Sequence, residues 1–234
     1  MRKAIAFIIN QQMRIYLPCF LMLMLPFASF SQEIVNLNAS WINLDVEMVW
    51  NDRVDMELAQ STRFNDLVGS FSVSNTTFKV SYELNKWLKT TAGYRYSYRV
   101  NKSRKFNRYQ LALQAGTKWN DVKLSWRTRL EYKDAINRDN QTTRLRNKFS
   151  AGYKIKSIDV EPKIFVEYWY TFDEPLQDFS KYRIGISLSK EIVNRFDFKV
   201  GFNYDSDLNQ DELERESIVL LGLTYKFKRA KATN

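Results

Sequence analysis

Guanidinium groups are the side chains of this sequence with the clearest chemical potential. They recur on neighbouring predicted hairpins, where alternation places them on one face of a sheet as a ladder. The planar guanidinium fork binds phosphate and carboxylate groups, so this ladder could hold an anionic solute. The favoured interpretation is instead structural, an ion-pair network with carboxylates on the same face. The arginines are Arg95, Arg127, Arg129, Arg144 and Arg146, and the carboxylates are Glu83, Glu131, Glu161 and Glu167.

Histidine is absent from the 234 residues, which limits the reactions that the chain can catalyse. A positioned histidine is the most common general base near neutral pH. The remaining carboxylates often lie beside Arg or Lys, and a nearby opposite charge keeps them ionised. We therefore predict that the chain is not an enzyme and that it uses no cofactor.

The acidic segment 205–216 spaces oxygen-bearing side chains in the manner of an EF-hand calcium loop. Gln210 occupies the position at which the sharp turn of such a loop needs glycine, and predicted strands flank the segment in place of helices. We expect a solvated acidic loop, and calcium binding remains the alternative. The candidate ligands are Asp205, Asp207, Asn209, Asp211 and Glu216.

The elements that would position these residues are strands, because apolar and polar residues alternate with a period of two. Short turns such as Asn120-Asp121 separate some segments, and longer polar loops separate the others. This order predicts an up-and-down meander with two unlike ends. The eleven segments are 40–50, 54–64, 71–84, 88–100, 108–119, 122–132, 144–154, 158–170, 181–189, 195–204 and 217–227, and the long loops are 65–70, 101–107, 133–143, 171–180 and 205–216.

The apolar face of these strands is predicted to point outward, into lipid. No charged residue interrupts it, and an Arg or Lys facing the middle of a bilayer costs about 2–4 kcal/mol. Trp50, Trp87 and Trp119 lie beside short turns, and tyrosines lie towards the long loops, as expected of interfacial girdles. We therefore predict an all-β, antiparallel up-and-down transmembrane barrel, a monomer of the cell outer membrane that contacts outer-membrane lipid.

The number of strands is a difficulty for this prediction. Bacterial single-chain barrels have an even number of strands, with both termini in the periplasm. Either residues 32–39 supply a short additional strand, or one of the eleven segments is not a strand. We expect twelve strands, within a range of ten to twelve.

A signal peptide is predicted at residues 1–31, which leaves residues 32–234 to form the barrel. Basic residues precede the apolar run 15–30, and Ser29 and Ser31 have the spacing of a cleavage site. Export would separate the chain from nucleic acid, so its net charge of +10 does not indicate a nucleic-acid partner. The segment 217–227 resembles the aromatic-ended last strand that the barrel assembly machinery recognises.

Several short motifs together resemble the outer-membrane barrels of Bacteroidetes catalogued as domain of unknown function 2490. The resemblance spans residues 40–227 and implies an outer-membrane location without an established activity. The motifs are Trp41 in the first strand, Arg63-Phe64-Asn65, Gly93-Tyr94-Arg95-Tyr96, Arg127-Thr128-Arg129, and Arg144 with Arg146.

Three functional hypotheses remain. The leading one is an outer-membrane barrel whose charged lumen serves stability or the passage of small solutes. The second is a surface or uptake protein that binds an anion or calcium. The third is a soluble periplasmic barrel that carries an apolar ligand inside, which the aromatic girdles disfavour.

Overall fold

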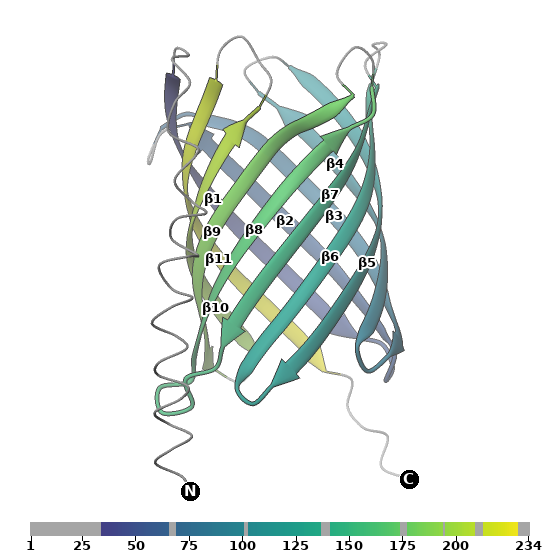
Figure 1. Ribbon diagram of the computed structural model, residues 1–234, viewed down its shortest axis with the longest axis vertical. Coiled ribbons are helices and arrows are strands. Elements are labelled where there is room, and N and C mark those ends of the chain that lie inside the picture. Colours follow the sequence, from purple (N-terminus) through teal and green to yellow (C-terminus); the bar gives the residue numbers. More distant parts are fainter. Residues whose placement is uncertain are drawn as a thin grey trace, which may run out of the picture. The chain divides into compact units, whose positions relative to one another are not determined.

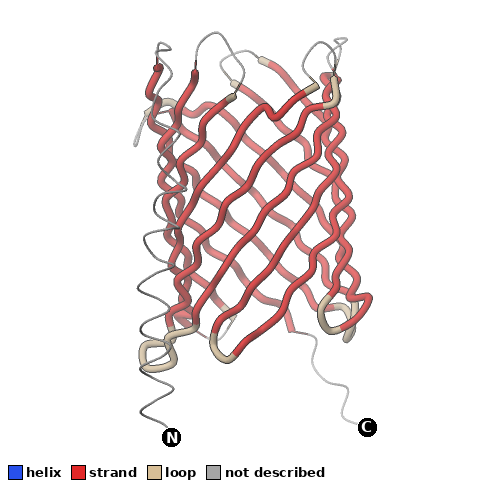
Figure 2. The backbone as a smooth tube through the Cα atoms, in the orientation of Figure 1, coloured by secondary structure: helices blue, strands red, loops and turns tan. Residues whose placement is uncertain are grey.

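The computed structural model describes residues 34–65, 69–100, 103–136, 141–173, 177–193, 195–208 and 213–228. The predicted signal peptide lies outside these ranges. The described residues form one closed barrel of eleven tilted strands (Figures 1 and 2), and no helix among them is long and apolar enough to cross a membrane. The strands are β1 (Ile34–Val49), β2 (Val54–Asn65), β3 (Phe71–Asn85), β4 (Leu88–Arg99), β5 (Arg104–Trp119), β6 (Val122–Ala135), β7 (Gln141–Tyr153), β8 (Val160–Thr171), β9 (Asp178–Val193), β10 (Phe196–Asp207) and β11 (Leu213–Lys228).

The barrel closes between its first and last strands. Consecutive strands pair antiparallel, whereas β1 and β11 pair parallel, because an odd number of alternating strands leaves the first and last running in the same direction. The expected twelve strands are therefore not found among the described residues. Residues 34–39 extend β1 and do not form a separate strand. Closure leaves no strand edge unpaired. A sheet that spans a membrane must be closed in this way, because lipid cannot satisfy backbone hydrogen bonds.

Local sequence explains the turns at one end of the barrel. The Asn51 side chain accepts hydrogen bonds from the backbone N–H groups of Arg53 and Val54, and Asn85 accepts one from Trp87. Asn120 adopts a φ of 54°, a left-handed conformation that asparagine tolerates better than most residues. These side chains make the tight turns that the sequence predicts.

The strands at the opposite end extend further than predicted. β5 begins at Arg104, inside the predicted loop 101–107, and β10 and β11 together occupy most of the predicted loop 205–216. Hydropathy alternation ends where the wall leaves the apolar band, but the backbone hydrogen-bond ladder continues beyond it. The long-loop end of the barrel is therefore built from polar strand ends.

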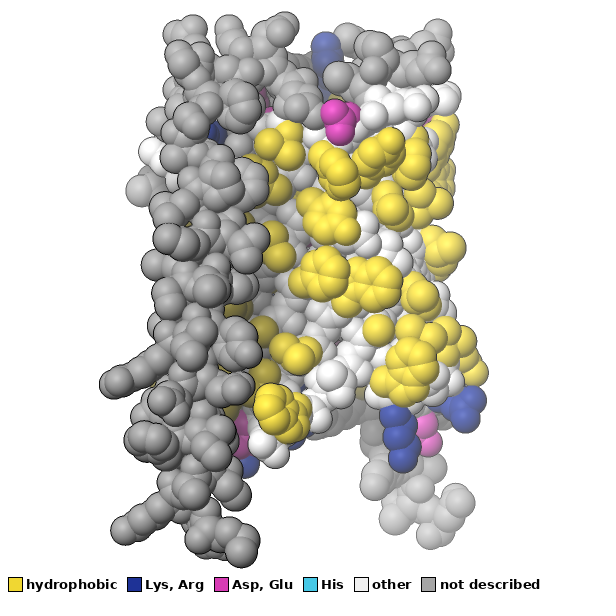
Figure 3. All heavy atoms as spheres, in the orientation of Figure 1, with side chains coloured by type: hydrophobic (Ala, Val, Ile, Leu, Met, Phe, Trp, Pro, Cys, Tyr) yellow, Lys and Arg dark blue, Asp and Glu magenta, His cyan; other side chains and the backbone are white. Residues whose placement is uncertain are grey.

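The barrel exposes apolar side chains on its outside and buries charged side chains inside, the reverse of the arrangement in a soluble protein. Large apolar side chains such as Leu58, Leu111 and Ile164 are more than half exposed on the outside, and Figure 3 shows hydrophobic side chains over the visible part of this wall. Trp87 and Trp119 are exposed beside the short turns, as predicted. The largest fully buried side chains include Glu131, Glu167 and Asp205, which point into the lumen. An apolar exterior around a charged interior matches the predicted orientation of the faces.

Candidate functional site

The predicted arginine ladder lies on the inner wall of the barrel, where cross-strand register brings its members together. In the β6–β7 hairpin, Arg129 stands directly opposite Arg146, and Glu131 stands opposite Arg144. Directly opposite residues point to the same face of an antiparallel pair. The alternation of the sequence therefore places all of these charges in the lumen.

Glu131 is the centre of the ladder. Its side chain is 1% exposed, and one of its carboxylate oxygens lies 2.7 Å from Nη1 of Arg146. Arg108, Arg129 and Arg144 each approach the same carboxylate to 3.5 Å. A buried carboxylate requires paired charge and hydrogen bonds, and here four guanidinium groups share one.

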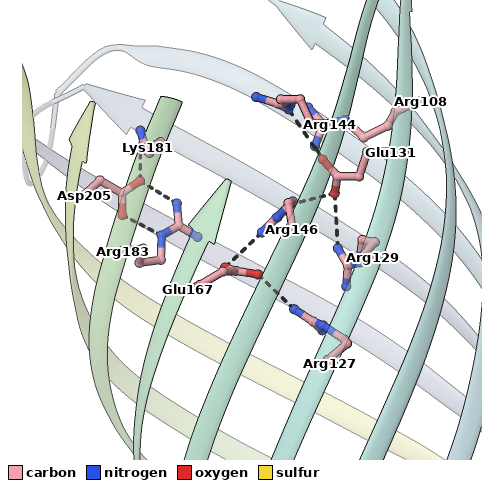
Figure 4. A network of polar contacts seen from close by, with 10 residues as sticks. All are labelled: Arg108, Arg127, Arg129, Glu131, Arg144, Arg146, Glu167, Lys181, Arg183 and Asp205. Atoms are coloured by element: carbon pink, nitrogen blue, oxygen red, sulfur yellow. Dashed lines mark hydrogen bonds and ion pairs between the residues drawn. The ribbon is translucent and has the colours of Figure 1, made fainter. Parts of the chain in front are cut away.

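A second carboxylate, Glu167, extends the network to β8. Arg146 lies 3.0 Å from it and Arg127 lies 3.2 Å from it, so Arg146 joins the two glutamates. Figure 4 shows this connection and the arginines that converge on Glu131. Two of the four predicted carboxylates thus hold all the predicted arginines except Arg95, whose Nε donates a hydrogen bond to Thr77 at 2.9 Å.

The other predicted carboxylates lie near the short turns. Glu161 forms an ion pair with Lys123 at 2.5 Å, not with an arginine of the ladder. Glu83 lines a separate cavity of about 370 Å³ at the same end, together with Lys89 and Trp87.

A further ion-pair group lies on β9 and β10, beside the strand that carries Glu167. Both carboxylate oxygens of Asp205 accept hydrogen bonds from Arg183, at 2.5 and 2.6 Å, and Lys181 lies 3.1 Å away. Glu216 pairs with Arg63. These cations are matched by nearby carboxylates, in contrast to those around Glu131.

Two tryptophans inside the lumen each contact two guanidinium groups. The guanidinium carbons of Arg63 and Arg183 are 5.2 and 4.8 Å from the ring centre of Trp41. Those of Arg183 and Arg146 are 5.3 and 4.6 Å from the ring centre of Trp169. Cation–π contact with an aromatic face stabilises a guanidinium group without adding a negative charge.

The predicted calcium loop is not a loop in the described residues. Asp205 and Asp207 belong to β10 and Glu216 belongs to β11, and Asp205 stands directly opposite Glu216 in the strand ladder. All three contact cationic side chains. Asn209 and Asp211 lie outside the described residues, and no metal-binding cluster occurs among the residues that are described.

A central cavity of about 440 Å³ connects these groups. Thirteen Lys and Arg side chains line it, against four Asp and Glu side chains. The carboxylates are Asp45, Glu57, Glu167 and Asp205. The cavity is therefore strongly cationic, and charge of that sign and density attracts anions.

Several residues of this cavity were not predicted from the sequence. Lys133 fell in a predicted loop, and Arg108 stood at the first position of a predicted strand, although both occupy lumen positions in longer strands. Trp41 and Trp169 share the register of Asp45 and Glu167, which could have placed them inside the lumen. Alternate residues of a strand face the lumen. Extending that rule beyond the last apolar residue of each segment would have placed these residues inside the barrel.

Comparison with known proteins identifies the family. The family model described as "Protein of unknown function (DUF2490)" matches residues 38–216, and the chain belongs to that family. No curated protein matches the sequence.

Solved structures give weak likenesses. A bacterial polysaccharide outer membrane secretin matches with a TM-score of 0.49 and 13% identity over 72% of this chain and 62% of that one. The outer-membrane OmpT of Vibrio cholerae matches with a TM-score of 0.40 and 8% identity over 66% of this chain and 54% of that one. The chain thus spans less than two thirds of the length of either structure.

Proposed function

We propose that this protein is an outer-membrane barrel whose lumen admits small anionic solutes and lets them pass. The observation that carries the proposal is the cationic lining of the central cavity, thirteen basic against four acidic side chains. A cationic cleft with low-dielectric walls concentrates anions and raises their rate of entry.

The outer wall supports the membrane location. Exposed Leu, Ile, Val and Phe side chains cover strands all round the barrel, and exposed Trp side chains lie beside short turns. Soluble monomers rarely expose a continuous apolar surface of this extent. The lumen is lined with charges, so it offers no apolar interior of the kind that a soluble carrier of apolar ligands would need.

Structural ion pairing explains only some of the charged side chains in the lumen. Glu131 and Glu167 neutralise some of the arginines and link β5, β6, β7 and β8. The cations that line the cavity still outnumber the carboxylates that line it. Passage of anions explains that excess, whereas stability alone would be served by equal numbers of both charges.

The test is the reversal potential of the purified chain in a planar bilayer under a gradient of potassium chloride. We expect ion conductance with a reversal potential of the sign that chloride selectivity requires. A variant with Arg127→Gln and Arg129→Gln should shift the reversal potential towards zero. Lys156→Gln, which removes a cation from a turn outside the lumen, is the control and should leave it unchanged. Absence of conductance, or preference for potassium, would contradict the proposal.

A further inference from the structure

The inner wall made by β4, β5 and β6 carries a group of four cations around one aromatic ring. Phe106 is buried at its base, and the Lys133 ammonium lies 4.1 Å from the centre of the Phe106 ring. The Arg99 guanidinium carbon lies 5.6 Å from the same centre. Arg95 and Arg108 complete what we call the Phe106 cluster, and all five residues line the central cavity.

The backbone register forces the cations of the Phe106 cluster together. Arg108 on β5 stands directly opposite Arg95 on β4 and directly opposite Lys133 on β6. Like charges at directly opposite positions repel and destabilise a sheet. A row of three cations across three adjacent strands therefore favours the presence of an anion beside it.

The protein provides little negative charge for this row. Among the described residues, no carboxylate oxygen lies within 4.0 Å, the limit for an ion pair, of a side-chain nitrogen of Arg95, Arg99 or Lys133. Arg108 reaches Glu131 at 3.5 Å, but Glu131 also receives Arg129, Arg144 and Arg146. By contrast, Arg63 on β2 and Arg183 on β9 each contact a carboxylate.

We propose that the Phe106 cluster is a binding site for a compact oxyanion with two or more negative charges, of the phosphate or polycarboxylate class. The inference rests on the proposed entry of anions into the lumen and names where one would bind. Guanidinium groups donate paired hydrogen bonds to such oxygens, and the ammonium of Lys133 adds a point charge. The cavity of about 440 Å³ lies within the size range of small-molecule sites.

The test is calorimetric titration of the folded, detergent-solubilised chain with pyrophosphate and, separately, with citrate at constant ionic strength. We expect saturable binding of at least one of these anions. The one that binds more tightly identifies the phosphate or the polycarboxylate class. The variant Arg95→Gln with Lys133→Gln should weaken that binding roughly tenfold or more, as expected when charged hydrogen bonds are lost.

The matched control is Lys89→Gln with Lys123→Gln. It removes the same charge from the same two strands, but its lysines pair with Asp55 and Glu161 near the short turns. The control should bind within about twofold of the unmodified chain, a change of less than ~0.5 kcal/mol. Equal weakening in both variants, or no saturable binding by the unmodified chain, would overturn the proposed site.

Two further measurements keep the test decisive. The Arg95→Gln, Lys133→Gln variant should unfold at the same or a higher temperature than the unmodified chain without ligand, because it loses like-charge repulsion. If that variant does not fold, Arg99→Gln at the exposed edge of the cluster replaces it, with the same expected loss of binding. Site-specific binding without conductance would uphold this site and reject passage, whereas anion-selective conductance without saturable binding would do the reverse.

Discussion

The lumen has two halves that use charge differently. In the half next to the long loops, Glu131, Glu167 and Asp205 have side chains only 1–2% exposed, and each contacts two or more cations. In the half next to the short turns, Asp55, Glu57, Glu161 and Asp197 are 26–34% exposed, and each pairs with one lysine. The carboxylates near the long loops are buried and shared by several cations. Those near the short turns are partly solvated, and each has one cationic partner.

This difference indicates which charges the fold depends on. Removing one partner from a buried group leaves an uncompensated charge in a low-dielectric environment, whereas water screens the partner of an exposed pair. The excess of positive charge lies in the long-loop half, because one buried carboxylate shared by four arginines cannot neutralise all of them. We therefore expect stability to be sensitive in the long-loop half and insensitive in the short-turn half.

The largest expected effect comes from Glu131→Gln. This substitution leaves Arg108, Arg129, Arg144 and Arg146 around a neutral amide, and we expect the free energy of unfolding to fall by about 3–5 kcal/mol. Urea unfolding of the barrel in lipid vesicles measures it. A loss below about 1 kcal/mol, the range of a solvated pair, would remove the distinction between the two halves.

A smaller loss is expected from Arg183→Gln, which leaves Asp205 with Lys181 as its remaining cationic partner. We expect the free energy of unfolding to fall by about 1.5–3 kcal/mol, the range for a hydrogen bond to a charged group. Adding Asp205→Asn should recover part of that loss, because the buried carboxylate, by then held by Lys181 alone, is removed as well. A double-mutant cycle measures the coupling, and purely additive losses would show that the pair contributes nothing specific.

The corresponding change in the short-turn half, Glu57→Gln, should lower the free energy of unfolding by less than about 1 kcal/mol. Glu57 and Lys79 are partly exposed at 28% and 21%, so water replaces much of what the pair loses. The same urea unfolding experiment applies. A loss as large as that of Glu131→Gln would show that exposure does not explain the difference between the halves.

The smallest effect is expected outside the lumen, in the turn after β5. A hydrogen bond from Lys156 holds the pKa of Asp121 below its usual range. A carboxylate with a lowered pKa contributes stability above its unfolded pKa and loses it as the pH falls through the folded value. Stability should therefore not change through this group between pH 7 and pH 5, and Asp121→Asn should show the same pH profile as the unmodified chain. A divergence of the two profiles within that range, measured by thermal unfolding, would contradict the assignment.

The sequence predicted the strands better than their ends or their number. Alternation of apolar and polar residues marks a wall with one apolar and one polar face, so it identified each segment but stopped where the wall becomes polar on both faces. β10 and β11 accordingly continue into the predicted loop 205–216. The expectation of twelve strands came from a general rule about even numbers, and parallel pairing of β1 with β11 closes this barrel with eleven.

The composition of the candidate site was predictable, but its pairing was not. Parity placed Arg127, Arg129, Arg144 and Arg146 on the inner face, where the structure has them. The stagger between strands decides which charges meet, and it brought Glu161 to Lys123 while four arginines converged on Glu131. Arg108 and Lys133 were overlooked for the same reason that the strand ends were, since they lie beyond the clearest alternation.

The most direct test of the cationic excess is to locate an anion in the lumen. Crystals of the chain soaked in tungstate, a divalent oxyanion that scatters anomalously, would show where negative charge is held. The cluster around Phe106 should give the strongest anomalous peak inside the barrel, within hydrogen-bonding distance of Arg95, Arg108 or Lys133. A lumen without a peak, or one whose peaks lie only among the lysines of the short-turn half, would contradict the account.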